Sequence, residues 1–335
     1  MKDDIILQVE NLHTGFLVDN VPLEAVSGVS FSLKAGRVLG VVGESGCGKS
    51  VTAHSIMQLL PKYGRITEGS ITYTRATGEK IEIQKLRRTG HQMRQIRGKE
   101  ISMIFQDPMS SLNPVYPIGD QIAENIREHE KVTKREALDR ARKLLEDLEI
   151  PSAAERLGDY PHQFSGGMKQ RVCIAIALAC NPRILIADEP TTALDVTIQA
   201  QIIALMKKLQ REHGTSIMMI THNMGLVAEM ADDIAVMYMG RIVEYGSIRQ
   251  VMKSPAHPYT QGLLKAVPVL GMKKDRLYSI KGSTPSLGVD RPAGCEFASR
   301  CEYATEACRQ VPRAVEVEPG HQVRCWNYKE ATDNG

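Results

Sequence analysis

The fold of this chain is decided by the run Gly43-Glu44-Ser45-Gly46-Cys47-Gly48-Lys49-Ser50, which fits the phosphate-binding template G-x-x-x-x-G-K-[ST]. Residues 37–42 before it, which are apolar after Arg37, predict a buried strand, and residues 51–57 after it predict the start of a helix. Glycines let the backbone curve so that its N–H groups point at phosphate oxygens, and the helix N-terminus adds positive potential. Strand, loop and helix together predict a P-loop, or Walker A motif, in an α/β fold. A glycine-rich turn without a ligand is the plainer alternative, and the two correct flanks argue against it.

The side chains of this loop have separate predicted roles. Lys49 places a positive charge at the β- and γ-phosphates of a nucleotide, and the Ser50 hydroxyl binds Mg²⁺. The other predicted ATP contacts in the run are Gly43, Ser45, Gly46, Cys47, Gly48 and Val51. Cys47 has a second interpretation, because backbone N–H groups and Lys49 favour a thiolate whose oxidation would block nucleotide binding. Its simpler interpretation is a small residue that the loop tolerates.

Composition and charge limit the class of protein. The 335 residues are enough for two domains, or for one large domain with an appendage. A net charge of +3 is too small to indicate nucleic acid or an anionic membrane as the partner. The longest apolar run, residues 172–180, is too short to span a membrane, and no signal peptide follows Met1. We therefore expect a cytoplasmic protein that reaches a membrane only by docking to another protein.

Hydrophobic periodicity predicts alternating strands and helices over most of the chain. The predicted strands are 5–10, 29–33, 101–105, 184–187 and 216–220, and a β-hairpin arm is predicted at 240–246. The polar residues 62–100 predict turns and an irregular β segment. A helical block follows residue 118 and includes a capping box formed by Thr133 and Glu136. The recurrence of strand and helix predicts a parallel sheet covered by helices.

A second apolar strand ends in two carboxylates. Residues 184–187 run directly into Asp188 and Glu189, which is a Walker B pattern. Asp188 is placed to hold the hydration shell of Mg²⁺, and Glu189 is placed to orient or deprotonate an attacking water. A strand with an acidic end is common in isolation, but Walker A upstream makes nucleotide chemistry the better interpretation.

Between these motifs lies Phe164-Ser165-Gly166-Gly167-Met168, which opens a helix predicted to end near Ala179. Here the chain resembles the ATP-binding-cassette (ABC) family, whose signature is usually written L-S-G-G-Q. Phe and Met depart from that signature at its flanks, while Ser165, Gly166 and Gly167 are intact and form a second anion-binding helix N-terminus. In the family, the signature of one cassette closes over the nucleotide of its partner, so the resemblance implies an obligatory dimer.

The remaining motifs of the family occur in order. Gln106 matches the glutamine that contacts Mg²⁺ and couples to the membrane subunit, and Asp195 in Thr192-Ala193-Leu194-Asp195 matches the D-loop at the dimer interface. His222 matches the switch histidine at the γ-phosphate. Phe16 resembles the aromatic residue that stacks on adenine, although an aromatic residue near a first strand is more often part of the core. The resemblance thus implies an ATPase with Glu189 as general base, assisted by His222 and Lys49.

The resemblance also implies a fold and a division into domains. Residues 1–250 form an ABC-type P-loop NTPase cassette, with a parallel sheet core, an antiparallel β subdomain and an α-helical subdomain at about 107–165. Residues 251–335 are punctuated by prolines and predict a small, loop-rich, cysteine-containing C-terminal region with a regulatory or iron–sulfur role.

Two further stretches narrow the branch of the family. His257-Pro258-Tyr259-Thr260-Gln261-Gly262-Leu263-Leu264 and residues 105–114 are similar to the oligopeptide and dipeptide importer ATPases, including the D-type subunits of dipeptide permeases. This similarity implies an ATPase at the cytoplasmic face of the cell membrane that energises uptake of dipeptides or oligopeptides. The implied partners are a second ABC ATPase, as heterodimer or homodimer, two integral-membrane permeases and, indirectly, an extracytoplasmic peptide-binding protein.

Two alternatives to peptide import stay open at this point. One is an importer ATPase for nickel or another small solute. The other, of a different class, is a soluble ABC ATPase that acts on nucleic acid. The absence of a heptad run between Ser50 and Ser165, and the presence of one cassette in the chain, argue against nucleic acid as a partner.

Four of the seven cysteines lie near the end of the sequence, at Cys295, Cys301, Cys308 and Cys325. In a reducing compartment such a group favours metal or iron–sulfur ligation over disulfides. A [4Fe–4S] cluster needs four thiolates and is the favoured prediction, which the family resemblance also supports. Zn²⁺ is the alternative, although the short CxxC spacings of zinc ribbons are absent. Unligated core cysteines would be unusual in so loop-rich a segment.

Overall fold

The computed structural model describes residues 4–192, 194–267, 278–285 and 291–328. The chain forms two compact units, each assembled from separate segments. The first contains residues 34–37 and 86–220 together with Asp4, and the second contains residues 5–33, 38–85 and the chain from 221 onward. Ala193 of the predicted D-loop, and residues 268–277, 286–290 and 329–335 of the predicted C-terminal region, lie outside the described residues.

Three parallel strands form the sheet of the first unit. They are β6 (Ile101–Ile104), β7 (Ile184–Asp188) and β8 (Ser216–Thr221), with Ile101 opposite Ile184 and Ile184 opposite Ser216. All their residues are buried, as expected of parallel strands covered on both faces. The predictions of these three strands are confirmed to within one residue at each end. Because the strands are parallel, the residues that follow their carboxyl ends meet at one edge of the sheet.

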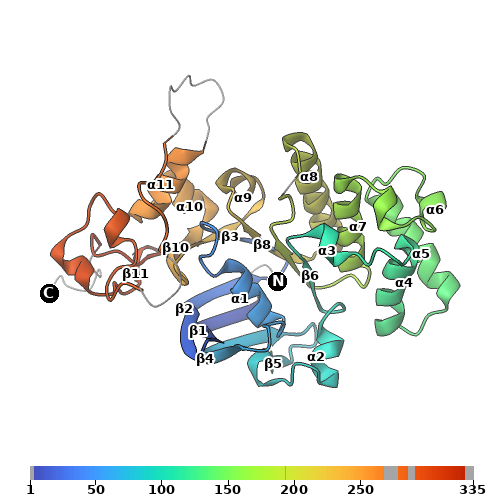
Figure 1. Ribbon diagram of the computed structural model, residues 1–335, viewed down its shortest axis with the longest axis horizontal. Helices are drawn as coiled ribbons and strands as arrows, with labels where there is room; N and C mark the ends of the chain where they lie inside the picture. Colours follow the sequence, from blue (N-terminus) through green and yellow to red (C-terminus); the bar gives the residue numbers. More distant parts are fainter. Residues whose placement is uncertain (1–3, 193, 268–277, 286–290, 329–335) are drawn as a thin grey trace. The chain divides into compact units, whose positions relative to one another are not determined.

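The helices of the first unit include a group of neighbours, α4, α5, α6 and α7 (Figure 1). The helices are α2 (His91–Ile96), α3 (Pro108–Ser111), α4 (Ile118–His129), α5 (Lys134–Asp147), α6 (Ala153–Arg156), α7 (Gly166–Leu178) and α8 (Val196–His213), with a 3₁₀ turn η2 (Pro161–Gln163). The predicted capping box of α5 is confirmed, since the Glu136 N–H donates to Thr133 Oγ1 (3.2 Å) and the Thr133 N–H donates to Glu136 Oε2 (2.7 Å). The buried face of α5 is formed by Ala137, Ala141 and Leu145.

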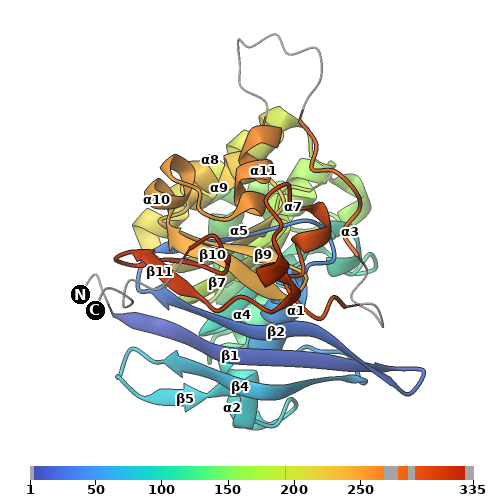
Figure 2. The same ribbon diagram turned by 90° about the vertical axis from the view of Figure 1, so that its left-hand side faces the viewer.

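The second unit contains a four-stranded antiparallel sheet. Its strands lie side by side in the order β2 (Val21–Lys34), β1 (Ile5–Val18), β4 (Gly64–Thr74) and β5 (Lys80–Glu82) (Figure 2). The irregular β segment predicted within residues 62–100 is present as β4, which pairs with β1 from Leu7 opposite Tyr73 onward, with shifts in register between Glu10 and Thr14 of β1. Among its side chains, Arg65, Thr67 and Glu68 are exposed, while Ile71 and Tyr73 are buried.

A second sheet of this unit begins with β3 (Val38–Val42), which leads into the Walker A loop and pairs in parallel with β9 (Asp233–Tyr238). β9 turns into β10 (Arg241–Ser247), so the predicted hairpin arm is confirmed. β12 (His321–Val323) pairs with β10, and β11 (Val315–Glu318) pairs with β12. The helices are α1 (Lys49–Ile56), α9 (Met224–Met230), α10 (Ile248–Lys253) and α11 (Pro258–Ala266), with 3₁₀ turns η1 (Ile83–Lys85), η3 (Ala298–Arg300) and η4 (Glu306–Arg309).

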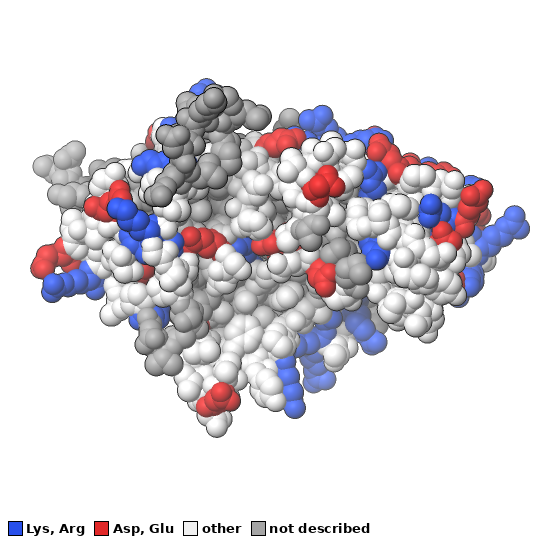
Figure 3. Space-filling model, turned by 45° about the horizontal axis from the view of Figure 1, so that its top comes forward, with Lys and Arg blue, Asp and Glu red and all other residues white. Residues whose placement is uncertain are grey.

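None of the helices in the described ranges combines the length and the apolar character that a membrane span requires. The face drawn in Figure 3 carries Lys and Arg side chains interspersed with Asp and Glu side chains. This mixture agrees with the small formal net charge of +3.

A buried carboxylate fixes the C-terminal strands to the rest of the second unit. Glu244 on β10 accepts hydrogen bonds from the N–H groups of Ala256 (2.7 Å) and His257 (2.8 Å), and its carboxylate lies 2.8 Å from His321 Nε2 on β12. Glu244 and His321 are each 1% exposed. A carboxylate is tolerated at this depth only because all of these groups solvate it.

Replacing this carboxylate should detach the C-terminal strands. We expect Glu244→Ala to lower the local free energy of unfolding of β11 and β12 by about 3 kcal/mol or more, because buried donors lose their acceptor. Amide hydrogen exchange measured by mass spectrometry checks this, with faster exchange expected in residues 315–323. Glu318→Ala, at an exposed carboxylate on β11, is the matched control and should exchange like the wild type. Equal exchange in Glu244→Ala and wild type would contradict the assigned role.

Candidate nucleotide-binding site

The Walker A loop lies between the end of β3 at Val42 and the start of α1 at Lys49. Gly48 has a φ of 99°, a conformation that favours glycine, and a side chain there would come within 2.6 Å of the Ala25 carbonyl oxygen. At Gly43 an added Cβ would lie 2.2 Å from the Met237 carbonyl oxygen. The glycines of the template are therefore required by close backbone packing as well as by the turn.

Lys49 closes the curve of the loop. Its Nζ donates to the carbonyl oxygens of Gly43 (2.8 Å) and Glu44 (2.9 Å), and the residue is 5% exposed. Ser45 and Gly46 at the tip are exposed, whereas Ser50 and Val51, in the first turn of α1, are half-buried. The predicted phosphate-binding residues thus share one loop and the N-terminus of one helix, where N–H groups and a cation favour an anion.

Cys47 is buried and 1% exposed, with its Sγ 3.8 Å from Lys49 Nζ. Burial raises the pKa of this thiol, and the opposing effect of Lys49 is smaller. The expectation that the loop favours a thiolate is therefore wrong in direction. The electropositive surroundings are present, but desolvation of the sulfur outweighs them.

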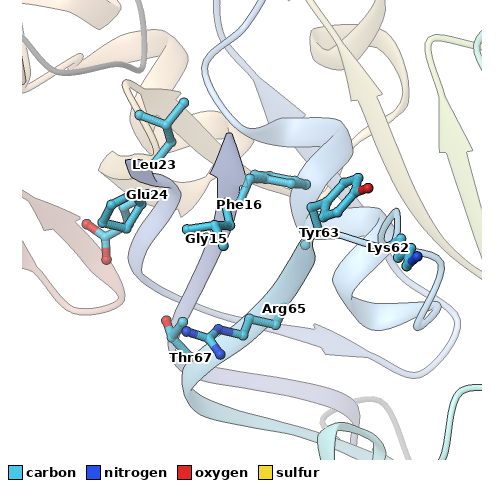
Figure 4. A pocket seen from close by; sticks show the side chains of 11 residues that line it. Gly15, Phe16, Leu23, Glu24, Lys62, Tyr63, Arg65 and Thr67 are labelled. Carbon is cyan, nitrogen blue, oxygen red and sulfur yellow. The ribbon is translucent and has the colours of Figure 1, made fainter. Parts of the chain in front are cut away.

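Phe16 lines a cavity of about 440 Å³ in the second unit (Figure 4). The cavity is also lined by Tyr63, Lys62 and Arg65, and the side chains of Phe16 and Tyr63 lie close together in the figure. The Phe16 ring packs against Gly64, where an added Cβ would come within 2.6 Å of Phe16 Cε1. Phe16 is half-buried beside a cavity, which is an arrangement that a flat aromatic ligand fits.

His222 follows β8 directly and is exposed. The next residue, Asn223, caps α9 by accepting a hydrogen bond from the Gly225 N–H (2.9 Å). The position of the histidine is therefore fixed on one side by a buried strand and on the other by a capped helix.

The first unit brings together three of the predicted residues at the carboxyl edge of its sheet. Asp188 ends β7 and is 2% exposed, and Glu189 follows it. Gln106, two residues after β6, donates from Nε2 to Glu189 Oε2 (3.2 Å), and Thr192 Oγ1 donates to the same oxygen (2.8 Å). Glu189 has a φ of 46°, so its backbone is strained where its side chain is held. Thr192 was not singled out as a contact of Glu189 in the sequence, although it lies three residues after it.

The signature residues form an exposed helix N-terminus. Ser165 is the N-cap of α7 and accepts a hydrogen bond from the Met168 N–H (3.3 Å). Ser165 and Gly166 are exposed, and an added Cβ at Gly167 would meet Ile198 of α8 at 3.0 Å. Asp195 caps α8, accepting from the Ile198 N–H (3.0 Å), and is also exposed. The predicted helix N-terminus at Ser165 is present, and the N-cap residues of α7 and α8 are both exposed.

The four C-terminal cysteines are half-buried, and each accepts a hydrogen bond from a backbone N–H. The donors are Tyr303 to Cys301 (3.4 Å), Thr305 to Cys308 (3.5 Å), Phe297 to Cys295 and Asn327 to Cys325. Burial raises the pKa of Cys295 to about 11, and the Phe297 N–H opposes this in part. Hydrogen bonds from amides to sulfur also occur in iron–sulfur proteins, where they tune the reduction potential of the cluster.

The sulfur atoms of these four cysteines do not come together around a common point. Among the described residues, no three His, Cys, Asp or Glu side chains are arranged so that they hold a metal ion. The predicted ligand set Cys295, Cys301, Cys308 and Cys325 is therefore not assembled into a metal site, although the Cys295 N–H donates to the Cys308 carbonyl oxygen (2.9 Å) and draws two of the four together.

Comparison with known protein families and relatives identifies the family of this chain. The model of the ABC transporter family matches residues 26–192, and that of the oligopeptide/dipeptide transporter C-terminal region matches residues 243–308. The dipeptide transport ATP-binding protein DppD of Bacillus subtilis is 47% identical over 96% of this chain and 94% of its own length. The oligopeptide transport ATP-binding protein OppD of Escherichia coli is 46% identical over 96% of this chain and 93% of its own length.

A solved structure also matches this fold. The dimeric structure of MJ0796, a bacterial ABC transporter cassette, has a TM-score of 0.64 and 27% sequence identity, and covers 72% of this chain and 99% of its own. The chain therefore belongs to the ABC transporter family, in the group whose members carry the oligopeptide/dipeptide transporter C-terminal region.

Proposed function

We propose that this protein is the ATP-hydrolysing subunit of an ABC importer that energises uptake of dipeptides or oligopeptides. The observation that carries the proposal is the Walker A loop, in which Lys49 Nζ binds the carbonyl oxygens of Gly43 and Glu44. Within the other unit, the Glu189 carboxylate is held by Gln106 and Thr192 on a strained backbone. The peptide cargo is supported by relatives whose names state peptide transport. No relative reported above is named for nickel, another solute or nucleic acid.

Each predicted site residue has a separate role in the proposed binding and hydrolysis of ATP. The Walker A backbone and Lys49 hold the phosphates, Phe16 stacks on adenine beside its cavity, and His222 contacts the γ-phosphate. Glu189 orients and deprotonates the attacking water, and Gln106 fixes the direction of that carboxylate. Mg²⁺, with Ser50, Asp188 and Gln106 as its direct or water-mediated partners, neutralises phosphate charge when bound.

The exposed helix end at Ser165-Gly166-Gly167 supports a proposed pairing of two cassettes. In the proposed assembly this helix end of one cassette binds the nucleotide phosphate held by a second cassette. The dimeric structure of MJ0796 supports such a pairing, and Asp195, exposed at the start of α8, would face that partner. Two membrane permeases and an extracytoplasmic peptide-binding protein complete the proposed complex at the cytoplasmic face of the membrane. The functional division at residue 250 also stays a prediction.

The four C-terminal cysteines are proposed to bind a [4Fe–4S] cluster, with Zn²⁺ as the alternative. Support comes from the amide donor on each sulfur and from the half-buried position of all four. Binding would require the sulfurs to draw closer than the described arrangement has them. No step of ATP hydrolysis is assigned to this group.

Glu189→Gln separates binding from hydrolysis. We expect ATP affinity within about twofold of the wild type and a kcat lowered at least about 100-fold, because the amide keeps the shape but does not accept the proton. Equilibrium binding and steady-state ATPase assays measure the two quantities. Glu212→Gln, at an exposed carboxylate in the last turn of α8, is the control and should keep wild-type rates. Wild-type turnover in Glu189→Gln would exclude the assigned base.

Cys47 should resist alkylation in the folded protein at pH 7. The thiol is buried and its raised pKa keeps it protonated, so little thiolate is present to react. Peptide mapping after timed treatment with iodoacetamide checks this, with faster labelling expected once the protein is unfolded in urea. ATPase activity that falls on alkylation in the wild type, but not in Cys47→Ser, would contradict the prediction and revive a redox role for this residue.

The proposed iron–sulfur cluster can be tested by measuring the metal content and the visible absorption of the protein. Protein purified without oxygen should contain about four iron atoms per chain and show broad visible absorption that bleaches on reduction. Cys308→Ser should lose most of this iron, whereas Cys173→Ser, at a buried cysteine of α7, should keep it. Stoichiometric zinc without iron would favour the alternative, and absence of both metals would remove the proposal.

A further inference from the structure

Glu44, the second residue of the Walker A loop, has every polar group held by the surrounding protein. Its N–H donates to the Tyr259 hydroxyl oxygen (2.9 Å), and its carbonyl oxygen accepts from Lys49 Nζ (2.9 Å). Its carboxylate accepts from Arg300 and from the Thr284 hydroxyl. In the template this position accepts any residue, so the template gives no reason for such a complete set of partners.

Arg300 binds the Glu44 carboxylate through both arms of its guanidinium. Nη1 lies 2.6 Å from Oε2 and Nη2 lies 3.1 Å from Oε1, which is the bidentate geometry of a strong ion pair. The Arg300 side chain is only 5% exposed, and that of Glu44 is 29% exposed. The remaining donors of Arg300 are also used, since Nε donates to the Lys281 carbonyl oxygen (2.9 Å). An arginine this enclosed is fixed in one position.

The charges of this pair reinforce one another. Burial alone raises the pKa of the Glu44 carboxyl, but the hydrogen bonds from Arg300 and Thr284 outweigh it and the net pKa is lowered. The hydrogen bond to Glu44 in turn raises the pKa of Arg300. Both groups therefore stay ionised over the whole neutral range, and the contact is permanent rather than pH-dependent.

Arg300 lies in the cysteine segment, at the end of η3 and directly before Cys301. Phe297, at the start of the same turn, packs against Tyr238 and Tyr259 with ring centroids 5.3 and 5.4 Å away. Tyr259 is the residue that accepts from the Glu44 N–H. Two contacts, one ionic and one aromatic, therefore run from this turn to the same residue of the Walker A loop.

We infer that Arg300 is a positioning residue for the nucleotide site: by fixing Glu44 it holds the Walker A loop in the curvature that binds phosphate. The C-terminal cysteine segment thereby sets nucleotide affinity without touching the nucleotide. The physical basis is preorganisation, because a loop already held in its binding conformation loses less entropy when the phosphates enter. Arg300 acts on the loop through Glu44 rather than on the proposed base Glu189, so we expect its loss to affect binding more than hydrolysis at saturation. The inference rests on the proposed binding of ATP at this loop.

The test compares Arg300→Ala with the wild type in the full-length protein, using ATP with Mg²⁺ and ADP as the probes. We expect the Kd for both nucleotides, measured by titration calorimetry, to rise roughly tenfold. KM should rise by a similar factor, while kcat stays within about twofold of the wild type. Arg309→Ala is the matched control, because Arg309 lies in the same segment and its side chain is 81% exposed.

A double-mutant cycle separates positioning from general damage. If Arg300 acts through Glu44, then Arg300→Ala should change the Kd little in a Glu44→Ala background. Arg300→Lys keeps the positive charge but cannot bind the carboxylate through two N–H groups, and it should give an intermediate Kd. This variant replaces Arg300→Ala in the test if Arg300→Ala fails to fold. Wild-type Kd in both Arg300 variants, or additive effects in the cycle, would overturn the inference. Failure of the wild type itself to bind ATP would instead refute the proposed function.

Discussion

The curvature of the Walker A loop is the constraint on which the proposed chemistry depends. Backbone N–H groups bind a phosphate only if successive residues turn them inward, and glycines packed against Ala25 and Met237 permit that turn. Lys49 holds it from within through two carbonyl oxygens. Tyr259 and Arg300, which are 215 and 256 positions further along the chain, hold it from outside. A site that is local in the sequence therefore depends on the C-terminal segment in the fold.

The sequence predicts those parts of the site that are determined by residues close together in the chain or by adjacent strands. A template of glycines between an apolar strand and a helix specifies a phosphate loop, and Thr133 with Glu136 specifies a helix start. Parallel strands ending at one edge explain why Gln106 and Glu189, 83 positions apart, meet in a hydrogen bond. In each case the pattern and the contact follow from a single element or from neighbouring strands.

The features of the fold and the site that the sequence does not predict depend on burial or on contacts between distant segments. The pKa of Cys47 follows from the loss of water around its sulfur, and no neighbour in the sequence reveals that loss. The pairing of β4 with β1 is a contact between distant segments of the chain, and the polar residues of β4 do not reveal it. Nothing in the sequence joins Arg300 to Glu44, since neither residue belongs to a template position with a required side chain. The incomplete convergence of the four cysteines is likewise a matter of loop geometry, which spacing alone does not determine.

Glu189 shows how strain and hydrogen bonding combine at the hydrolytic carboxylate. A φ of 46° costs free energy for a residue with a side chain, and such a conformation persists only where neighbouring contacts fix it. Here the Glu189 N–H is bonded to the Ile220 carbonyl oxygen, and the side chain is held by Gln106 and Thr192. Thr192 lies on the same turn as Glu189, but Gln106 comes from the exposed segment after β6. Displacement of that segment would remove the hydrogen bond from Gln106 to the carboxylate. The hydrogen bond that orients the proposed base therefore makes its orientation depend on the position of an exposed segment.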